Sequence, residues 1–127
     1  MITAIATTKA PQAIGPYSQA VIVDGFVFAS GQIALDPQTG NLVGESVAAQ
    51  TEQIFSNIQA LLSAAGSDLD HVVKTTCFLT SIDEFSAFNE VYGRYFTTHL
   101  PARSAVGVAG LPKGACVEVE VIAQVIA

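Results

Sequence analysis

The chain has 127 residues, of which 50% are hydrophobic and 13% are charged, and its formal net charge is −6. This length suits a single domain over residues 1–127, and the apolar content excludes an intrinsically disordered chain. The acidic balance counts against nucleic acid as a partner, because a negatively charged surface repels a phosphate backbone.

A β-hairpin is the first element that the sequence predicts, formed by residues 21–23 and 26–28. Asp24 and Gly25 stand between these two β-rich runs, and an Asp-Gly pair favours a type I′ turn, in which both central residues have a positive φ. Residues 36–41 follow with the composition of a loop.

A helix is predicted over residues 47–65, where apolar residues recur with the helical period. Ser46 is suited to cap its amino end, and Gly66 is suited to end it in the left-handed conformation. The period places Gln50 with the polar residues, away from the apolar stripe. Seven residues form that stripe: Val47, Ile54, Phe55, Ile58, Leu61, Leu62 and Ala65.

A strand over residues 72–80 and a second helix over residues 81–98 come next. Ser81 and Glu84 have the spacing of a capping box, in which each side chain bonds to the backbone of the other residue at the start of a helix. Six residues form the apolar stripe of this helix: Phe85, Phe88, Val91, Tyr92, Tyr95 and Phe96.

Two further strands, residues 103–108 and 117–125, bring the individually predicted strands to five, in an α+β fold for which we expect a six-strand sheet and two helices. Two helices cannot cover both faces of such a sheet, so we expect one face to meet another subunit. The low charged fraction agrees with this expectation, because ordinary domains carry about 25% charged residues.

Arg103 is one of only two arginines. Arg94, the other, is expected on the solvated side of its helix, whereas Arg103 starts an apolar strand. A guanidinium there needs either a carboxylate partner in a buried ion pair or an anionic ligand, because burying the charge alone is very costly. Its planar fork matches the two oxygen atoms of a carboxylate. The residues alone leave both alternatives open.

Glu118 and Glu120 alternate with valines in the last strand, which places both carboxylates on one face. A carboxylate that faces a poorly hydrated cleft has a raised pKa and can act as a base. On a solvated strand face it is an ordinary surface group. The last strand is therefore a candidate for general base chemistry, with a solvated face as the alternative.

No segment approaches the roughly 18 consecutive apolar residues of a membrane span. The amino end lacks the pattern of a secretory signal, so we expect a cytoplasmic protein without membrane contact. Cys77 and Cys116 are expected to be buried and reduced. Neither they nor His71 and His99 have the spacing of metal ligands, so no metal site is expected.

Six short motifs occur in order along nearly the whole chain: Ala13–Gln19, Ser30–Gln32, Asn89–Tyr92, Pro101–Ser104, Leu111–Lys113 and Val117–Glu120. Together they resemble the RidA/YjgF family of reactive-intermediate deaminases, and most of all its Gram-positive members. The Pro-Ala-Arg-Ser segment with the downstream Val-Glu pair is the most specific part of the resemblance.

The resemblance implies a chorismate-mutase-like α+β fold, with a mixed six-strand sheet and two helices on one face, assembled as a homotrimer around a barrel core. It implies clefts between adjacent subunits that bind small 2-imino and 2-keto acids. The implied reaction is hydrolytic deamination of 2-imino or enamine acids, such as 2-iminopropanoate and 2-iminobutanoate, to 2-keto acids and ammonia. This reaction requires no metal or organic cofactor.

The resemblance also implies roles for individual residues. Arg103 would hold the substrate carboxylate, and Glu118 would orient the hydrolytic water and move its proton, whereas Glu120 is expected to be structural. The implied substrate-binding positions are Tyr17, Ser30, Gly31, Asn89, Ser104 and Ala105.

Three positions depart from the family pattern. Ala105 stands where the family often has Cys, and since the backbone amide is expected to bind the ligand, Ala should preserve that contact. Gly107 and Gly110 replace positions that are commonly charged. We expect these two losses to affect the charge at the rim and the pairing of subunits more than the chemistry.

A non-catalytic, metabolite-binding regulatory module that uses the same cleft is the alternative function. Glu118 favours catalysis over this alternative, because a second negative charge beside a bound carboxylate does not help binding. A ribonuclease or translation inhibitor is a third reading. The net charge of −6 and the lack of a basic stripe count against it.

Overall fold

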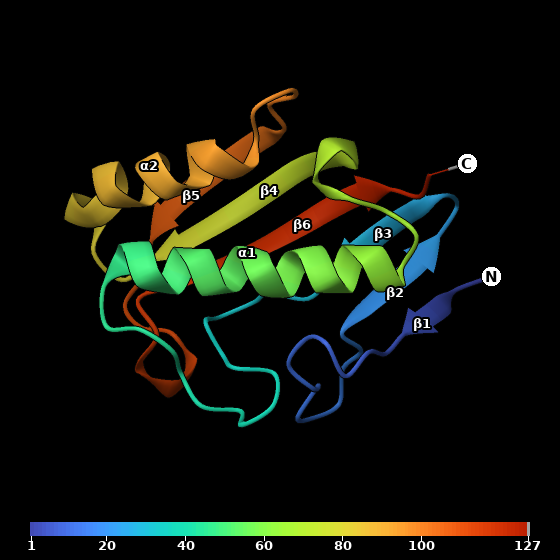
Figure 1. The fold of residues 1–127 in the computed structure, drawn as a ribbon, viewed down its shortest axis with the longest axis horizontal. Coiled ribbons are helices and arrows are strands. Elements are labelled where there is room, and N and C mark those ends of the chain that lie inside the picture. The colour runs from blue at the N-terminus through green and yellow to red at the C-terminus, as the bar shows by residue number, and fades with distance from the viewer. Residues whose placement is uncertain (127) are drawn as a thin grey trace.

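The computed structural model describes residues 1–126, which form a six-stranded mixed sheet and two helices (Figure 1). The strand order across the sheet is β1-β2-β3-β6-β4-β5. Neighbouring strands are antiparallel except β4 and β5, which are parallel and are connected through α2, as a crossover between parallel strands requires. The strands are β1 (Thr3–Ile5), β2 (Ala20–Val23), β3 (Phe26–Ala29), β4 (Val72–Leu79), β5 (Ala102–Gly107) and β6 (Val117–Gln124).

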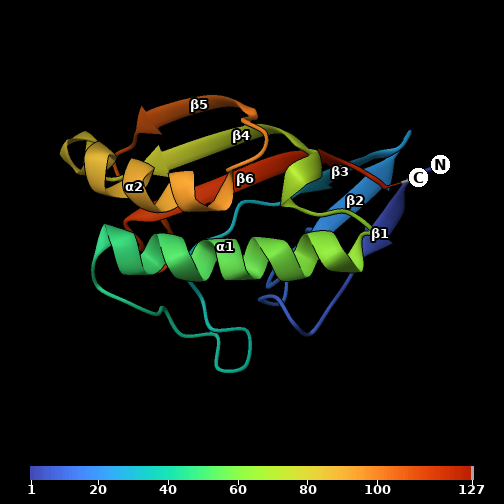
Figure 2. The same cartoon turned by 45° about the horizontal axis from the view of Figure 1, so that its top comes forward.

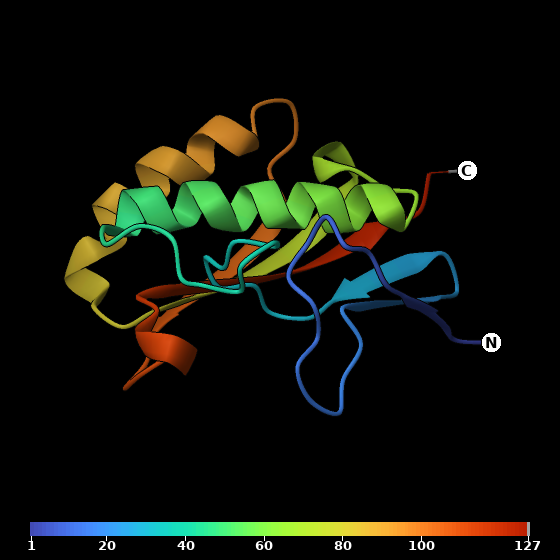
Figure 3. The ribbon, with the colours of Figure 1, turned by 60° about the horizontal axis from the view of Figure 1, so that its bottom comes forward.

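The helices are α1 (Val47–Ala64) and α2 (Phe85–Tyr95), with short 3₁₀ turns at Leu69–His71, Ile82–Glu84 and Pro112–Gly114. Both helices lie side by side on one face of the sheet (Figures 2 and 3). This arrangement confirms the expected α+β fold with its helices on one face.

The hairpin predicted around Asp24 and Gly25 is confirmed. These residues join β2 to β3 with φ values of 50° and 80°, and Val23 pairs with Phe26 directly beyond them. Both positive φ values are those of the type I′ turn, which matches the right-handed twist of the flanking strands. This local turn sets the register of the strands that lead into the site.

The first helix is also confirmed. The Ser46 side chain accepts a hydrogen bond from the backbone N–H three residues on, Gly66 has a φ of 77°, and all seven residues of the apolar stripe are buried. The expected exposure of Gln50 is wrong, because only 3% of it is exposed. Its amide donates to the Gly44 carbonyl and accepts from the Cys116 N–H, both at 3.0 Å, which satisfies its polar atoms inside the protein.

The second helix is shorter than the predicted 81–98. A 3₁₀ turn precedes it, and the Ser81 side chain makes no capping hydrogen bond, so the predicted capping box does not form. The helix ends at Tyr95 because Phe96 leaves the helical conformation, with φ −119° and ψ 84°. In this position Phe96 packs edge-on against Phe55 with ring centroids 5.6 Å apart. Such aromatic contacts contribute about 0.5–1.5 kcal/mol each beyond their buried area.

Strand β6 separates the two environments of the sheet. Val117, Val119 and Val121 are buried against the helices, whereas Glu118 and Glu120 point to the opposite, open face. The predicted alternation of these residues is therefore confirmed. Apolar side chains also lie exposed on the open face, where Phe28 is 42% exposed and Val106 is 43% exposed. No helix of residues 1–126 covers this face.

Candidate functional site

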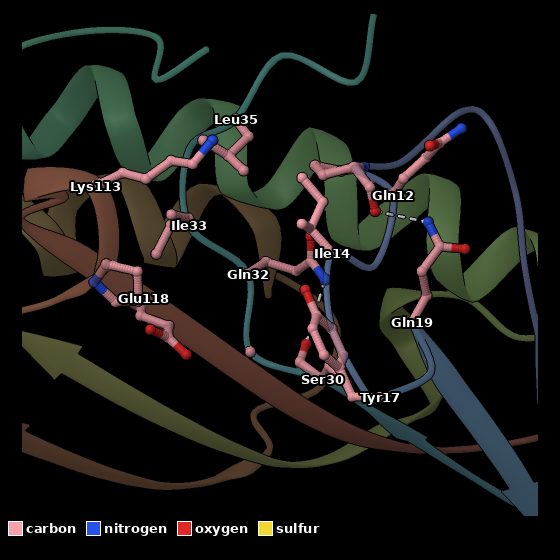
Figure 4. A pocket seen from close by; sticks show the side chains of 13 residues that line it. Gln12, Ile14, Tyr17, Gln19, Ser30, Gln32, Ile33, Leu35, Lys113 and Glu118 are labelled. Carbon is pink, nitrogen blue, oxygen red and sulfur yellow. Dashed lines mark hydrogen bonds between the residues drawn. The ribbon is translucent and has the colours of Figure 1, made fainter. Parts of the chain in front are cut away.

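A cavity of about 510 Å³ lies between the loop that precedes β2, the turn that follows β3 and the start of β6 (Figure 4). It brings together four of the predicted site residues: Tyr17, Ser30, Gly31 and Glu118. The rest of its lining consists of Pro11, Gln12, Ile14, Gln19, Gln32, Ile33, Leu35, Pro112 and Lys113.

Gln19 anchors the loop that forms one wall of this cavity. Its side chain is buried, accepts a hydrogen bond from the Thr7 N–H at 2.7 Å, and donates to the carbonyl groups of Thr7, Ala10 and Pro11 at 3.0, 3.3 and 2.7 Å. One amide therefore ties the chain around residues 7–11 to the start of β2. Tyr17 projects from the loop that this anchor closes (Figure 4).

Ser30 is held at two points by the end of the same loop. Its backbone N–H donates to the Gln19 carbonyl at 2.9 Å, and its hydroxyl group donates to the Ser18 carbonyl at 2.6 Å. These bonds fix the position of Ser30 relative to the loop that carries Tyr17.

The turn after β3 is joined to β6 by two backbone hydrogen bonds between Gln32 and Val119, at 2.8 and 3.1 Å. This pairing places Gly31 under the side chain of Glu118. A Cβ atom built on Gly31 would lie 2.9 Å from the carboxyl carbon of Glu118 and even closer to one carboxylate oxygen. Only glycine leaves room for that carboxylate, which explains the residue type at this position.

Burial raises the pKa of the Glu118 carboxyl group, and the nearby charge of Glu120 raises it further. The cause is partial removal of the charged form from water, followed by repulsion between two carboxylates on one strand face. Glu118 is thus the group in the cavity that is suited to take up a proton. Of the two alternatives for this strand, the geometry favours the carboxylate in a cleft.

Lys113 is the cation of the cavity lining, and it has an unusual backbone conformation. Its φ is 58°, in the left-handed region, and its ammonium group donates to the Gly40 carbonyl at 3.1 Å. The side chain therefore lies along the rim, directed away from Glu118 (Figure 4).

Arg103 lies elsewhere, on β5 at the edge of the sheet. Its guanidinium donates to the side-chain oxygen of Asn89 at 2.7 Å and sits over the rings of Tyr92 and Phe85, 4.8 and 5.2 Å from their centroids. The ring contacts orient a planar cation without using its N–H groups. Asn89 is therefore brought to Arg103 and not to the cavity.

Arg103 is exposed in this chain, because β5 is an edge strand and five of its six residues are exposed. None of the ion pairs within residues 1–126 includes Arg103, so the ion-pair alternative is not observed in this part of the chain. Arg94, as expected, is solvated and lies near Glu52 and Glu90. The guanidinium of Arg103 keeps donors free for an anion.

Arg103 and Glu118 face opposite sides of the sheet. Arg103 pairs with Thr75, which is buried on the helix side, whereas Glu118 is in line with Phe78 and Val106 on the open side. Two strand spacings and three residues along a strand separate their α-carbons by about 14 Å. The two side chains of one chain therefore cannot contact the same small ligand.

Ser104 and Ala105 follow Arg103 on the edge strand. The Ser104 hydroxyl lies on the open face, where the ammonium group of Lys74 donates to it at 3.0 Å. Ala105 is half-buried on the side of Arg103. The single chain thus brings Ala105, but not the Ser104 side chain, to the side of Arg103.

The cysteines and histidines lie apart from the cavity. Cys77 is buried, which raises its pKa to about 11, and Cys116 is only half-buried, contrary to expectation, with a pKa that burial also raises. His71 bonds to Asp68, and His99 to the Val72 carbonyl. Within residues 1–126, no cluster of metal-ligating side chains is present. In the same range, no helix is both long and apolar enough to cross a membrane.

Two residues that organise the cavity were not predicted as functional. Gln19 and Lys113 belong to motifs quoted above, but their roles depend on contacts with Thr7, Pro11 and Gly40, which are distant in sequence. A glutamine at the start of an apolar strand, where burial is expected, was the available signal for Gln19.

The sequence has clear relatives. Residues 7–125 match a protein-family model described as endoribonuclease L-PSP. The chain is 58% identical over 121 residues to a Lactococcus lactis protein whose assigned name is that of a regulator, AldR, covering 95% of this chain and 96% of that protein. It is 50% identical over 119 residues to human 2-iminobutanoate/2-iminopropanoate deaminase, covering 94% of this chain and 87% of the human protein.

Solved structures give the same picture of the fold. Yeast Mmf1 superimposes with a TM-score of 0.96 at 42% identity, covering 99% of this chain and 100% of that one. TdcF of E. coli, in a crystal structure with bound serine, superimposes with a TM-score of 0.91 at 41% identity, covering 96% of this chain and 98% of that one.

Proposed function

The chain belongs to the endoribonuclease L-PSP family, which is the RidA/YjgF family, and from this premise we propose that it hydrolyses short-lived 2-imino and enamine acids to 2-keto acids and ammonia. The substrates we propose are 2-iminopropanoate and 2-iminobutanoate. Relatives about 50% identical to this chain, the human protein among them, carry the name 2-iminobutanoate/2-iminopropanoate deaminase. The observation that carries the proposal is the half-buried carboxylate of Glu118 in a cavity of ligand size.

Arg103 holds the carboxylate of the substrate in this proposal. Its ring contacts and its bond to Asn89 orient the guanidinium and leave N–H groups for two parallel hydrogen bonds to a carboxylate. A bound carboxylate fixes the position of the adjacent imine carbon. Such orientation can lower a reaction barrier by several kcal/mol, and the largest effects of this kind reach about 7–11 kcal/mol. The serine held by TdcF also carries a carboxylate next to a carbon that bears nitrogen.

The complete site is shared between subunits of a homotrimer. Arg103, Asn89 and Ala105 of one chain contact the substrate together with Tyr17, Ser30, Gly31 and Glu118 of its neighbour. This division is supported by the opposite orientation of Arg103 and Glu118 in one chain and by the open sheet face with Phe28 and Val106 exposed. The Ser104 hydroxyl lies on the open face of the sheet, so it contacts the substrate only where the neighbouring chain packs against that face.

Glu118 activates the water. In its ionised form it accepts a proton from a water molecule as the water oxygen bonds to the imine carbon, and it then returns that proton to the nitrogen. This gives a carbinolamine, with a hydroxyl and an amino group on one carbon. Glu118 then transfers the hydroxyl proton to the amino nitrogen as the carbon–nitrogen bond breaks, so that ammonia leaves and the oxygen remains as a keto group. Proton transfer by a positioned carboxylate contributes typically about 10²–10⁴-fold to a rate.

A coupled assay tests this function. An amino-acid oxidase, or a pyridoxal-phosphate-dependent dehydratase, generates the imine from alanine or threonine in the presence of this protein. We expect faster release of ammonia and keto acid than the spontaneous hydrolysis gives. If the folded protein binds pyruvate but ammonia is released only at the spontaneous rate, the proposed deaminase activity is contradicted.

That last outcome would instead support a metabolite-binding regulatory module. The relative named as a regulator, at 58% identity, is the observation that favours this second function. The same cavity and Arg103 would then sense a keto acid without turnover. An endoribonuclease, as the family description has it, fits less well with a net charge of −6.

A further inference from the structure

The hydroxyl group of Ser30 directs its proton away from the cavity. Its oxygen lies 2.6 Å from the carbonyl oxygen of Ser18, a typical distance for an O–H···O hydrogen bond. A carbonyl group cannot donate, so the Ser30 proton lies between the two oxygens. If the proton rotated away, two unprotonated lone pairs would face each other at this short distance.

The backbone N–H of Ser30 is also engaged, with the Gln19 carbonyl at 2.9 Å. Both donors of Ser30 therefore point to residues 18–19, and the loop that contains them is anchored by the buried Gln19 side chain. What the Ser30 side chain presents to the cavity is the lone pairs of its oxygen. The group is an acceptor only, and it is held in place before a ligand arrives.

We infer that Ser30 recognises the nitrogen end of the ligand by accepting a hydrogen bond from its N–H group, so that the cavity selects an imine or enamine over the corresponding keto acid. This inference rests on the proposed function, because it requires that 2-imino and 2-keto acids enter the cavity. The ligand class is a small 2-substituted carboxylate whose second carbon carries N–H. A keto oxygen has only lone pairs and cannot donate to Ser30.

The surroundings of Ser30 strengthen this selection. Glu118, whose carboxylate lies over the adjacent Gly31, is another acceptor when it is ionised. The amide of Gln32 donates to the Ser30 carbonyl, at 3.3 Å, and the amide of Gln19 is used by its own loop. The side-chain amides of Gln19 and Gln32 are thus occupied by the protein, whereas Ser30 and Glu118 offer acceptors to the ligand.

The selection has a consequence for turnover. When the imine becomes a keto acid, the N–H group that Ser30 accepted is replaced by an oxygen that faces its lone pair. The product then loses a hydrogen bond and gains a repulsive contact, so it binds more weakly than the substrate. Ser30 favours release of the product by this exchange.

A pair of stable ligands tests the inference. Oxamate carries an NH₂ group where pyruvate carries a methyl group, and a half-turn about its C1–C2 bond places this NH₂ group where the keto oxygen of pyruvate would lie. Neither ligand is consumed during the measurement. By isothermal titration calorimetry, we expect the wild-type protein to bind oxamate about three- to tenfold more tightly than pyruvate, the range that one hydrogen bond supplies. In Ser30→Ala the ratio should fall to about one, with pyruvate binding unchanged or tighter.

Ser30→Cys is a second variant, and it keeps the shape of the side chain. The ratio of oxamate to pyruvate affinity should fall in this variant too, because sulfur is a weak hydrogen-bond acceptor. Ser63→Ala, on the exposed face of α1, is the control and should keep the wild-type ratio. Equal binding of both ligands by the wild type, or equal weakening of both in the folded Ser30 variants, would overturn the inference. Preference for oxamate without faster ammonia release would overturn the deaminase and leave the role of Ser30 standing.

Discussion

The carboxylate of Glu118 lies directly over the α-carbon of Gly31, with no room for a methyl group between them. The pairing of Gln32 with Val119 holds the two segments in this register. The position of the candidate catalytic carboxylate therefore depends on the absence of a side chain on a neighbouring segment. This relationship leads to the first prediction.

Gly31→Ala should displace the Glu118 carboxylate without unfolding the protein, because Gly31 does not have a positive φ and the obstructing atoms belong to a side chain. We expect a fall in kcat of roughly 10- to 100-fold, the size that a small misplacement of a catalytic group causes. The coupled ammonia assay measures it. Gly93→Ala is the matched control: its new methyl group meets nothing within 4 Å, so activity should be unchanged.

Glu118→Gln should lower imine hydrolysis by roughly 10²–10⁴-fold, because glutamine keeps the size of the side chain but cannot take up a proton. Pyruvate binding should survive, since a negative charge beside the ligand has been removed. Glu120→Gln, which changes the exposed carboxylate two residues along the same face, should have a much smaller effect. Full activity in both variants would mean that the glutamates of β6 are structural. A larger loss of activity in Glu120→Gln than in Glu118→Gln would mean that Glu120, and not Glu118, carries the chemistry.

Stability should depend on pH through Glu118. Its pKa is raised in the folded protein by burial and by Glu120, so the folded state binds the proton more tightly than the unfolded state. The stabilisation by this proton is fully present below the ordinary glutamate pKa of about 4.3 and is lost as the pH rises through the raised value. Glu118→Gln should therefore raise the Tm at pH 7 and change it little at about pH 4. Differential scanning calorimetry at both pH values checks this, and a lower Tm at pH 7 would contradict it.

Arg103→Ala should weaken pyruvate binding about 30- to 1,000-fold, the equivalent of about 2–4 kcal/mol for a bidentate, charged contact, and leave the oligomer assembled. Calorimetry measures the binding and sedimentation measures the assembly. Normal turnover in this variant would refute the role of Arg103. An unfolded variant would favour a structural role for its contacts with Asn89 and Tyr92.

Co-expression of Arg103→Ala with Glu118→Gln tests whether one site is shared by two chains. Each variant alone should be inactive. In a cyclic trimer each mixed assembly has one interface with both residues intact, so random mixing in equal amounts should restore about a quarter of the wild-type activity. No recovery in mixed trimers, purified with a different tag on each chain, would contradict a site shared between two chains.

Gln19→Leu should destabilise the wall of the cavity, because three carbonyl groups lose their donor and the Thr7 N–H loses its acceptor. We expect the free energy of unfolding to fall by roughly 2–4 kcal/mol, since buried polar groups are left unpaired. Urea denaturation measures this change. Gln12→Leu, at an exposed position of the same loop, is the control. Equal stability of the two variants would mean that Gln19 does not anchor the loop.

Local patterns in the sequence predicted most of the elements. The Asp24-Gly25 turn, the Ser46 cap and the alternation of Glu118 with buried valines each depend on residues within a few positions of one another. Such short-range preferences act in any fold, so they can be recognised without it. The second helix was predicted less well, because its end at Tyr95 depends on Phe96 packing against Phe55 of another helix.

Residue types and their short-range spacing indicated which side chains could do the chemistry: a scarce arginine at the start of an apolar strand and two glutamates on one strand face. Where these side chains lie depends on the fold of the whole chain. Pairing of β5 with β4, and of β4 with β6, turned Arg103 to the helix side and Glu118 to the open side. Register between strands distant in sequence is set by the packing of the whole core, and a shift of one residue would reverse every side chain. No local pattern carries that information.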